Sequence, residues 1–405
     1  MPVNLFRQLT DLESDFNYAH DDGRYALKVG LVATLYFWEG HTKPVRDVLV
    51  DCFEDYQRLF GEHLKWGWNP LNQYPMKLAN KKFPNLRTYV ETLDKDDCIE
   101  WYLDSSKDDE SVDDYRVQGI TRRAWQGKLL SYFQFTMPWR SLQHPEPAAF
   151  HTLLTKFCQR LKPFHGLAGL GTLMPHQDDS FQWCEFEDAQ RYFALDVGPG
   201  FSLARRVSDG IKSVNWYTIL GRELTNKLGG ARALKAQLND PAIQLHEVGE
   251  TILIQAGDLP ILGPVAEGRP PLYVKVNEVL RAVRAADLDS LHSGSVTGAL
   301  HFNPRTTNLW LRRFDADGIW PPYGPDALAA MDAETSLDAS SSEAASTEHR
   351  PPRLRVAGGE ACPQAGYWFT PAKSGSRKYF EQGELMPDFR SQYGDTIWQW
   401  DEDQA

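Results

Sequence analysis

The sequence lacks an apolar run long enough to cross a membrane as a helix. Its longest apolar stretches, such as Val29–Trp38, are interrupted by glycine and threonine and fall short of the ~20 residues that a helical span requires. The N-terminus, Met-Pro-Val-Asn-Leu-Phe-Arg, has no basic start followed by an apolar segment, so it does not resemble a Sec signal peptide. These absences predict a cytoplasmic protein without a membrane span.

Closely spaced cysteine pairs are lacking as well. The chain has five cysteines, an odd number, scattered at Cys52, Cys98, Cys158, Cys184 and Cys362. This usage suits a reducing compartment and argues against a disulfide framework. We expect all five to be free thiols.

Sequence signatures of catalysis are missing too. The chain has neither a Gly-x-Ser-x-Gly elbow nor a His-Glu-x-x-His helix, and the glycines of 198–206 lack the Gly-Lys-Ser/Thr ending of a phosphate loop. One set of residues could supply imidazole and carboxylate ligands to a metal, although its spacing matches no strong motif: His165, His176, Asp178 and Asp179. We therefore expect a non-enzymatic protein with no catalytic residue, metal or cofactor. A metal-dependent hydrolase using these four residues is the alternative.

The residues that are present are those of a globular protein. Hydrophobic residues make up 42% of the 405 residues and charged residues 24%, which excludes a disordered or fibrous chain. The 13 Trp, 16 Tyr and 20 Phe suit a packed core or a recognition surface, because aromatic rings bury large areas at low entropic cost.

The net charge of −12 is concentrated in two segments. Residues 91–114 hold eleven acidic residues against Lys95 and Lys107, and residues 326–348 hold six acidic residues and no Lys or Arg. Such charge repels phosphate backbones, so we expect no direct nucleic-acid binding, and it attracts a basic protein partner. The predicted partner-binding residues are Asp94, Asp96, Asp97, Asp108, Asp109, Glu110, Asp113 and Asp114. The alternative for 107–114 is a solvated loop.

Hydrophobic periodicity predicts strands and helices in alternation. We expect strands near 25–38, 98–103, 129–137 and 167–174, helices near 42–60, 86–93, 145–161 and 180–193, and a hairpin over 243–256 that bends at Gly249-Glu250. The pattern leaves 273–283 open between strand and helix. This order predicts an α+β fold in which helices flank a largely antiparallel sheet.

Composition divides the chain into three parts. After Pro325 it changes to Ala, Ser, Asp, Glu and Thr, and from Arg353 it is again rich in Trp, Tyr and Phe. We predict a main domain over 1–325, an acidic flexible linker over 326–352 and a small β-rich module over 353–405.

Two blocks carry a resemblance to a known family. They are Gly210–Gly230, which contains Gly-Ile-Lys-Ser-Val-Asn-Trp and a later Leu-Gly, and Ile254–Gly263, Ile-Gln-Ala-Gly-Asp-Leu-Pro-Ile-Leu-Gly. In this order they resemble the TsiV-like type VI secretion immunity family, with a match over residues 1 to about 300. After Gly263 the sequence departs from the family's Asp-x-Asn. We expect Trp216 and the glycines to hold core and turn positions, with recognition carried by loops.

The resemblance implies a protein that is encoded beside a secreted toxin and protects the producing cell by binding it. Some members neutralise nuclease effectors, so the expected partner is a cognate secreted nuclease whose active site this chain occludes. A third alternative is an adaptor or chaperone that loads the effector onto the secretion machinery. The C-terminal module also resembles one found at toxin-immunity loci.

Overall fold

The structure is a computed structural model of the whole chain. It describes residues 5–143, 148–176, 181–292, 301–322, 355–370, 376–388 and 396–400. The chain divides into two compact units, Met1–Ala330 and Met331–Ala405, which are described separately. The linker predicted over 326–352 lies outside the described residues.

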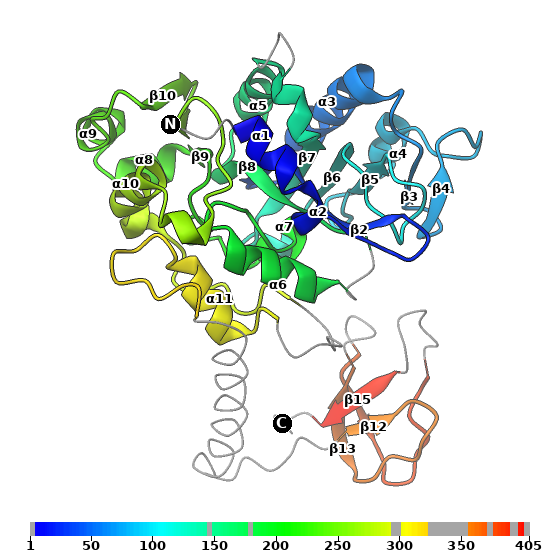
Figure 1. Cartoon of the computed structure of the whole chain (residues 1–405). Coiled ribbons are helices and arrows are strands. Elements are labelled where there is room, and N and C mark those ends of the chain that lie inside the picture. The colour runs from blue at the N-terminus through cyan, green and yellow to red at the C-terminus, as the bar shows by residue number, and fades with distance from the viewer. Residues whose placement is uncertain are drawn as a thin grey trace. The chain divides into compact units, whose positions relative to one another are not determined.

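The larger unit is built on one 11-stranded sheet, seen nearly edge-on among its helices in Figure 1. The strand order is β10-β11-β9-β8-β2-β7-β6-β5-β3-β4, with β1 beside β2. The strands are β1 (Tyr18–Ala19), β2 (Tyr25–Phe37), β3 (Trp66–Asn69), β4 (Tyr74–Lys77), β5 (Glu100–Asp104), β6 (Arg116–Ile120), β7 (Ser131–Met137), β8 (His165–Leu173), β9 (Tyr217–Leu220), β10 (Ile243–Val248) and β11 (Thr251–Ala256). Each described pair of neighbouring strands is antiparallel, as predicted.

Strand β2 forms the centre of the sheet. It pairs with β7 on one side and β8 on the other, and all of its residues except Tyr25 are buried. A strand covered on both faces reads as a continuous apolar run. This run is what predicted the strand over 25–38.

Helices cover both faces of this sheet. They are α1 (Leu5–Asp11), α2 (Glu13–Phe16), α3 (Lys43–Phe60), α4 (Leu86–Glu91), α5 (Ala148–Leu161), α6 (Gln182–Arg191), α7 (Gly200–Leu203), α8 (Arg222–Lys227), α9 (Ala231–Gln237), α10 (Pro271–Leu280) and α11 (Pro304–Leu311). Figure 1 shows α3 and α5 side by side on one face. Their Phe53 and Phe157 rings meet Phe133 of β7 edge-on, with centroids 5.2 Å away in each case.

The opposite face of β7 points toward α7. A Cβ placed on Gly200 would lie 3.3 Å from Gln134 Nε2 and 3.5 Å from Tyr132, and these two residues alternate with Phe133 along the strand. The alternation therefore turns an aromatic row toward α3 and α5 and a polar row toward α7.

Most predicted elements are confirmed within a few residues. The bend at Gly249 joins β10 to β11, where its φ of 62° suits glycine. Segment 273–283, which the sequence left open between strand and helix, is helical. Its residues up to Leu280 belong to α10, and Pro271 lies in the first turn of that helix. Thr42 precedes α3, and its hydroxyl donates to Glu39 O instead of accepting a helix N–H. Strands β1, β3, β4 and β6 and helices α1, α2, α9 and α11 were not predicted.

The smaller unit contains a four-stranded sheet in the order β12-β15-β13-β14. Its strands are β12 (Arg355–Ala357), β13 (Gly366–Phe369), β14 (Lys378–Phe380) and β15 (Ile397–Trp400). A separate small core fills it, formed by Val356, Cys362, Trp368, Phe380, Met386 and Trp398. The predicted β-rich C-terminal module is confirmed. In neither unit do the described residues include a helix long and apolar enough to cross a bilayer.

Candidate functional site

The predicted acidic segment is split into two groups by a strand. Asp94, Asp96 and Asp97 precede β5, and the other five acids lie in the loop between β5 and β6. The four residue steps of β5 separate the two groups by about 13 Å before their loops are added. The two groups therefore extend from opposite ends of β5.

The first group lies in an exposed loop with its own internal hydrogen bonds. Asp97 Oδ2 accepts from Asp94 N at 3.0 Å, and the guanidinium of the buried Arg46 donates to Asp97 O at 2.7 Å. The loop is joined to the short 3-10 turn after β6, Ala124–Gln126, because Ala124 N donates to Lys95 O at 2.8 Å. That turn carries Trp125, which is 70% exposed.

The second group is partly neutralised by cations from β2 and its preceding turn. Arg24 Nη1 lies 2.8 Å from Asp108 Oδ2, and Lys28 Nζ lies 3.2 Å from Asp113 Oδ1 and 2.8 Å from Asp114 Oδ1. Burial lowers the pKa of Lys28, but the two carboxylates outweigh it and the net direction is upward. Asp113 and Asp114 therefore hold a nearly buried lysine in place.

Acidic residues still outnumber basic ones on this side of the molecule. Around the β5–β6 loop and the turn before β2 we count seven acids, Asp21, Asp22, Asp108, Asp109, Glu110, Asp113 and Asp114, which we call the 108–114 acidic surface. They face four basic residues, Arg24, Lys28, Lys65 and Lys107. Among the described residues Asp109 forms no ion pair, and Glu110 lies 3.7 Å from Arg24.

The histidines of the metal alternative lie at opposite ends of β8, His165 within the strand and His176 beyond it. His165 is the first residue of this strand and is fully buried, with Nε2 3.2 Å from Val207 O; burial lowers its pKa to about 3. His176 follows the strand's other end and packs on Tyr102, and burial together with Arg116 lowers its pKa to about 4. Eight strand steps, about 26 Å, separate the ends, so the two imidazoles cannot share a metal. Asp178 and Asp179 lie outside the described residues.

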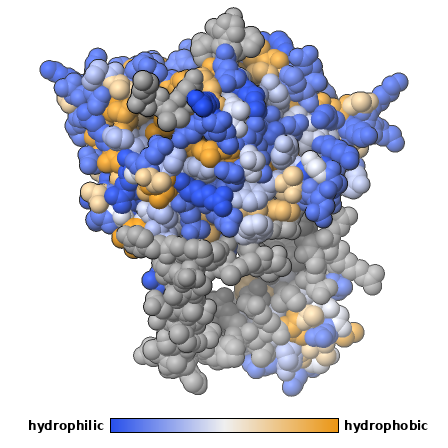
Figure 2. Space-filling model, in the orientation of Figure 1, coloured by the Kyte–Doolittle hydropathy of each residue, from blue (hydrophilic) through white to orange (hydrophobic). Residues whose placement is uncertain are grey.

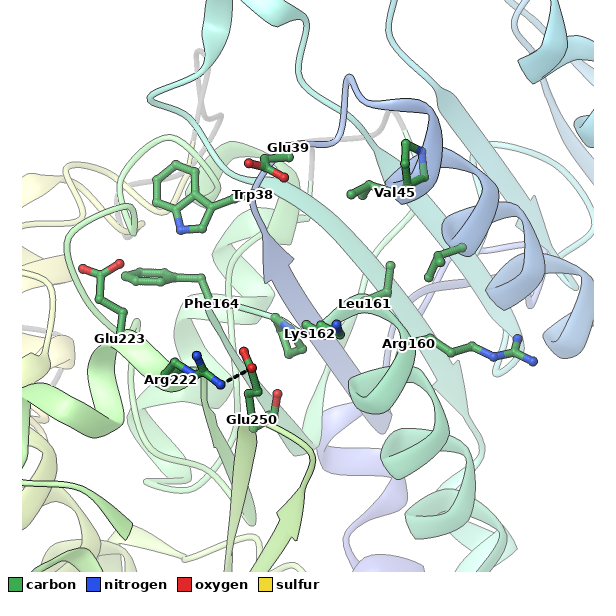
Figure 3. Close-up of a pocket in the computed structure, with 15 residues that line it drawn as sticks. Trp38, Glu39, Val45, Arg160, Leu161, Lys162, Phe164, Arg222, Glu223 and Glu250 are labelled. Atoms are coloured by element: carbon green, nitrogen blue, oxygen red, sulfur yellow. Dashed lines mark hydrogen bonds and ion pairs between the residues drawn. The ribbon is translucent and has the colours of Figure 1, made fainter.

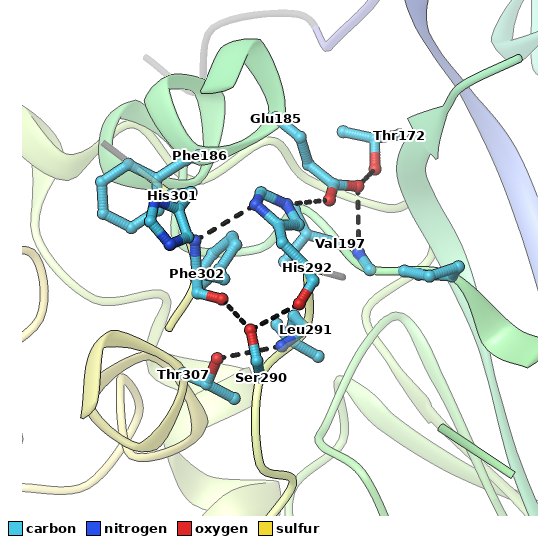
Figure 4. Close-up of polar contacts among 12 residues, drawn as sticks. Thr172, Glu185, Phe186, Val197, Ser290, Leu291, His292, His301, Phe302 and Thr307 are labelled. Atoms are coloured by element: carbon cyan, nitrogen blue, oxygen red, sulfur yellow. Dashed lines mark hydrogen bonds and ion pairs between the residues drawn. The ribbon is translucent and has the colours of Figure 1, made fainter. Parts of the chain in front are cut away.

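A buried acid–histidine pair that the sequence did not reveal joins α6 to a later segment (Figure 4). His292 Nδ1 accepts from Phe302 N at 3.1 Å, so Nε2 carries the proton and donates to Glu185 Oε2 at 2.8 Å. The other oxygen of Glu185 accepts from the Thr172 hydroxyl and from Gly198 N. Burial raises the pKa of Glu185, but these donors outweigh it and the net direction is downward. A carboxylate so fully bonded anchors segments and is poorly placed to act as a base.

A pocket of about 430 Å³ opens where the ends of β2, α5 and the β10–β11 hairpin meet (Figure 3). Trp38 and Phe164, with ring centroids 5.4 Å apart, form part of its apolar lining. Glu39 and Lys162 also line it, and both have positive φ values, 60° and 46°. The pocket therefore combines apolar walls with charged groups of both signs.

A second cavity, of about 290 Å³, lies over the polar row of the sheet, and we call it the sheet-face cavity. Its floor is a cross-strand ladder in which Gln118 Nε2 donates to Gln134 Oε1 at 2.5 Å and Gln134 Nε2 donates to Thr34 Oγ1 at 2.8 Å. At one end Arg116 Nε donates to the buried Asp104 at 2.6 Å. More of the side chains that line this cavity can form hydrogen bonds than of those that line the first pocket.

No large apolar patch marks a partner site on the face seen in Figure 2, where apolar residues form small groups within a mostly hydrophilic surface of the larger unit. Within the described chain, no three His, Cys, Asp or Glu residues group as metal ligands do. Sequence reasoning found the acids because they are contiguous. It missed Arg24 and Lys28, which only the fold brings to them.

The fold is similar to that of a known secretion-system protein. It matches the structure of the Pseudomonas aeruginosa T6SS protein PA0821 with a TM-score of 0.69 and 28% sequence identity, over 82% of this chain and 96% of that one. Residues 48–314 match the sequence profile of the TsiV family, described as type VI immunity for VRR-NUC. The chain belongs to this family of type VI immunity proteins. A search of curated protein sequences finds no match.

The two sequence blocks that resembled the family support each other in the structure. Trp216 Nε1 in the first block donates to Gly257 O in the second at 2.9 Å, and Ala256 N donates back to Trp216 O at 2.8 Å. Trp216 is 3% exposed, and Gly230 and Gly257 have positive φ values. The blocks occupy core and turn positions as expected, so they define the fold.

Proposed function

We propose that this protein binds a cognate nuclease effector of the type VI secretion system and blocks its active site, without itself making or breaking a bond. The observation that carries the proposal is membership of the TsiV family over residues 48–314, a family described as immunity for VRR-NUC. Nucleases bind their substrate through Lys and Arg. An acidic partner can therefore occupy the same cleft.

The 108–114 acidic surface is the part of the chain best suited to this role. Its excess of carboxylates would steer a basic partner during approach, because complementary charge mainly raises association rates. The loop at Asp94, Asp96 and Asp97 is a second contact in the proposal. Beside it the exposed Trp125 is the kind of side chain that anchors protein interfaces.

The surface assignment is tested by reversing Asp109 and Glu110 together to lysine. These two are chosen because Asp113 and Asp114 hold Lys28 in place, so that changing them would also disturb β2. At low salt the association rate constant for the effector should fall about tenfold, with little change in dissociation. The difference should shrink as salt is added.

The matched control reverses two exposed acids away from both acidic groups, Glu247 of β10, at the far edge of the sheet, and Glu278 of α10. It changes the net charge equally and tests whether position matters. If the control slows association as much as the pair at Asp109 and Glu110, or if neither does, the assignment of the 108–114 acidic surface is wrong.

The function itself is tested by expressing the chain together with the toxic product of the neighbouring gene. Growth rescue and copurification of the two proteins support immunity by binding. An adaptor or chaperone would copurify with the effector but leave it toxic. For the metal-dependent hydrolase, elemental analysis of the purified chain would show a stoichiometric transition metal.

A further inference from the structure

Two arginines that have no acidic partner among the described residues lie near an exposed phenylalanine. The guanidinium carbons of Arg122 and Arg205 lie 5.9 Å and 6.0 Å from the centroid of the Phe201 ring. Neither arginine forms an ion pair with any described residue, and Phe201 is 40% exposed. Guanidinium groups prefer carboxylate or phosphate partners, and no described acidic side chain supplies one to either of these two.

Arg122 is the more constrained of the two. It is 8% exposed, its Nε donates to Leu130 O at 2.9 Å, and its Nη2 is buried without a hydrogen-bond partner. Burial, and then repulsion from Arg205, lowers its pKa. A buried cation that lacks a counter-charge is costly, and an anion bound beside Phe201 would relieve that cost.

Phe201 also forms one wall of the sheet-face cavity. Its ring centroid lies 6.3 Å from that of Tyr132, which lines the same cavity. The amides of Gln118, Gln134 and Gln182 contribute both donors and acceptors to the lining, and Gln182 Oε1 is buried without a partner. At about 290 Å³ the cavity is near the lower end of the range for small-molecule sites, about 300–1,000 Å³.

Among the described residues, most acidic groups at this cavity already have partners. Asp104 is already bonded to Arg116, and Glu185 to His292 and two further donors. Glu100 lines the cavity without an ion pair among the described residues, and burial raises its pKa, which favours its neutral form. Glu100 is therefore the described acid of the lining that is not already bonded, and Arg122 and Arg205 lie outside the lining, next to its Phe201 wall.

The geometry points to a binding site for a nucleoside monophosphate, with its phosphate on Arg122 and Arg205 and its base stacked on Phe201 within the sheet-face cavity. Guanidinium forks match phosphate oxygens, aromatic rings stack on any base, and amide side chains match the donors and acceptors at base edges. A single phosphate requires only this local pair of cations. The acidic net charge of the chain opposes an extended polymer, which needs a continuous basic surface.

This inference does not rest on effector binding, and calorimetric titration of the full chain with AMP, GMP, CMP and UMP tests it. At least one should bind saturably, and inorganic phosphate and the matching nucleoside should each bind more weakly. Arg205→Gln removes one charged hydrogen-bond donor group from an exposed position and should weaken binding about 10- to 100-fold. Arg232→Gln, an exposed arginine of α9, is the matched control and should leave affinity unchanged.

Three outcomes would overturn the assignment. The first is that none of the four nucleotides binds. The second is that Arg205→Gln and Arg122→Gln both bind as tightly as the natural chain. The third is that inorganic phosphate binds as tightly as the nucleotide, which would leave an anion site without a base pocket. If the variant at the buried Arg122 fails to fold, the variant at the exposed Arg205 still tests the site.

Discussion

Replacing Asp104 with asparagine should strongly destabilise the larger unit. The Asp104 side chain is fully buried and accepts from three donors at 2.6 Å each, Arg116 Nε, the Tyr102 hydroxyl and Ser106 N. Asparagine keeps one acceptor oxygen but removes the charge. Arg116, whose side chain is 6% exposed, would then lose its counter-charge; outside this pair it has a bond to Met174 O and one buried nitrogen without a partner among the described residues.

The expected loss follows from the uncompensated arginine. Breaking a buried ion pair by removing one partner costs about 3–5 kcal/mol. We expect about 3 kcal/mol, because the remaining amide oxygen preserves part of the hydrogen bonding. Urea unfolding followed by tryptophan fluorescence measures it. Asp109→Asn, the same chemical change at a position without an ion pair among the described residues, should change the unfolding free energy by less than about 0.5 kcal/mol.

A double-mutant cycle separates the ion pair from a general loss of packing. Arg116→Met alone should destabilise, because Asp104 is left as a buried anion. The combination with Asp104→Asn should recover most of the loss, since neither charge remains buried alone. If Asp104→Asn costs less than about 1 kcal/mol, or if the two losses simply add, the reasoning about this pair is wrong.

Other predictions concern titration, thiol access and close packing. Burial raises the pKa of Asp188 to about 8, so in the folded protein this carboxyl group holds a proton that it releases near pH 4 in the unfolded chain. The stability of the fold should therefore fall as pH rises from 4 to 8. In melting curves, Asp188→Asn should flatten that fall. In the native chain Ellman's reagent should react with Cys98 at most, because the other four cysteines are buried, whereas urea should expose all five. Gly40→Ala should cost about 1–3 kcal/mol, because its Cβ would overlap Ser131, and unfolding at the natural chain's urea midpoint would contradict this.

The elements that the sequence predicts are those whose patterns arise from burial alone. Strand β2 is buried on both faces and α3 on one, so each shows a continuous run or a helical period. The missed hairpin of β3 and β4 has no such pattern, being made of short strands containing Gly, Asn and Pro. Gly67 is required there by a neighbouring strand, because a Cβ would lie 2.6 Å from Tyr102 O. That requirement exists only in the folded chain.

The same reasoning explains what the sequence missed at the surface and in the cavities. Contiguity suggested one acidic patch, but β5 divides the segment, and residues far away in the sequence, such as Lys28, neutralise part of it. The Glu185–His292 pair joins residues 107 positions apart. Arg122 and Arg205 are separated almost as widely. Local periodicity carries no information about such pairings.

Titration of the purified effector's nuclease activity with this protein tests the central claim most directly. If the chain acts as a stoichiometric blocker, activity should fall linearly with the amount added and vanish at a fixed molar ratio, with no further change over time. Continuing loss of activity at substoichiometric amounts would indicate catalysis. Full nuclease activity in the presence of excess protein would contradict immunity by binding.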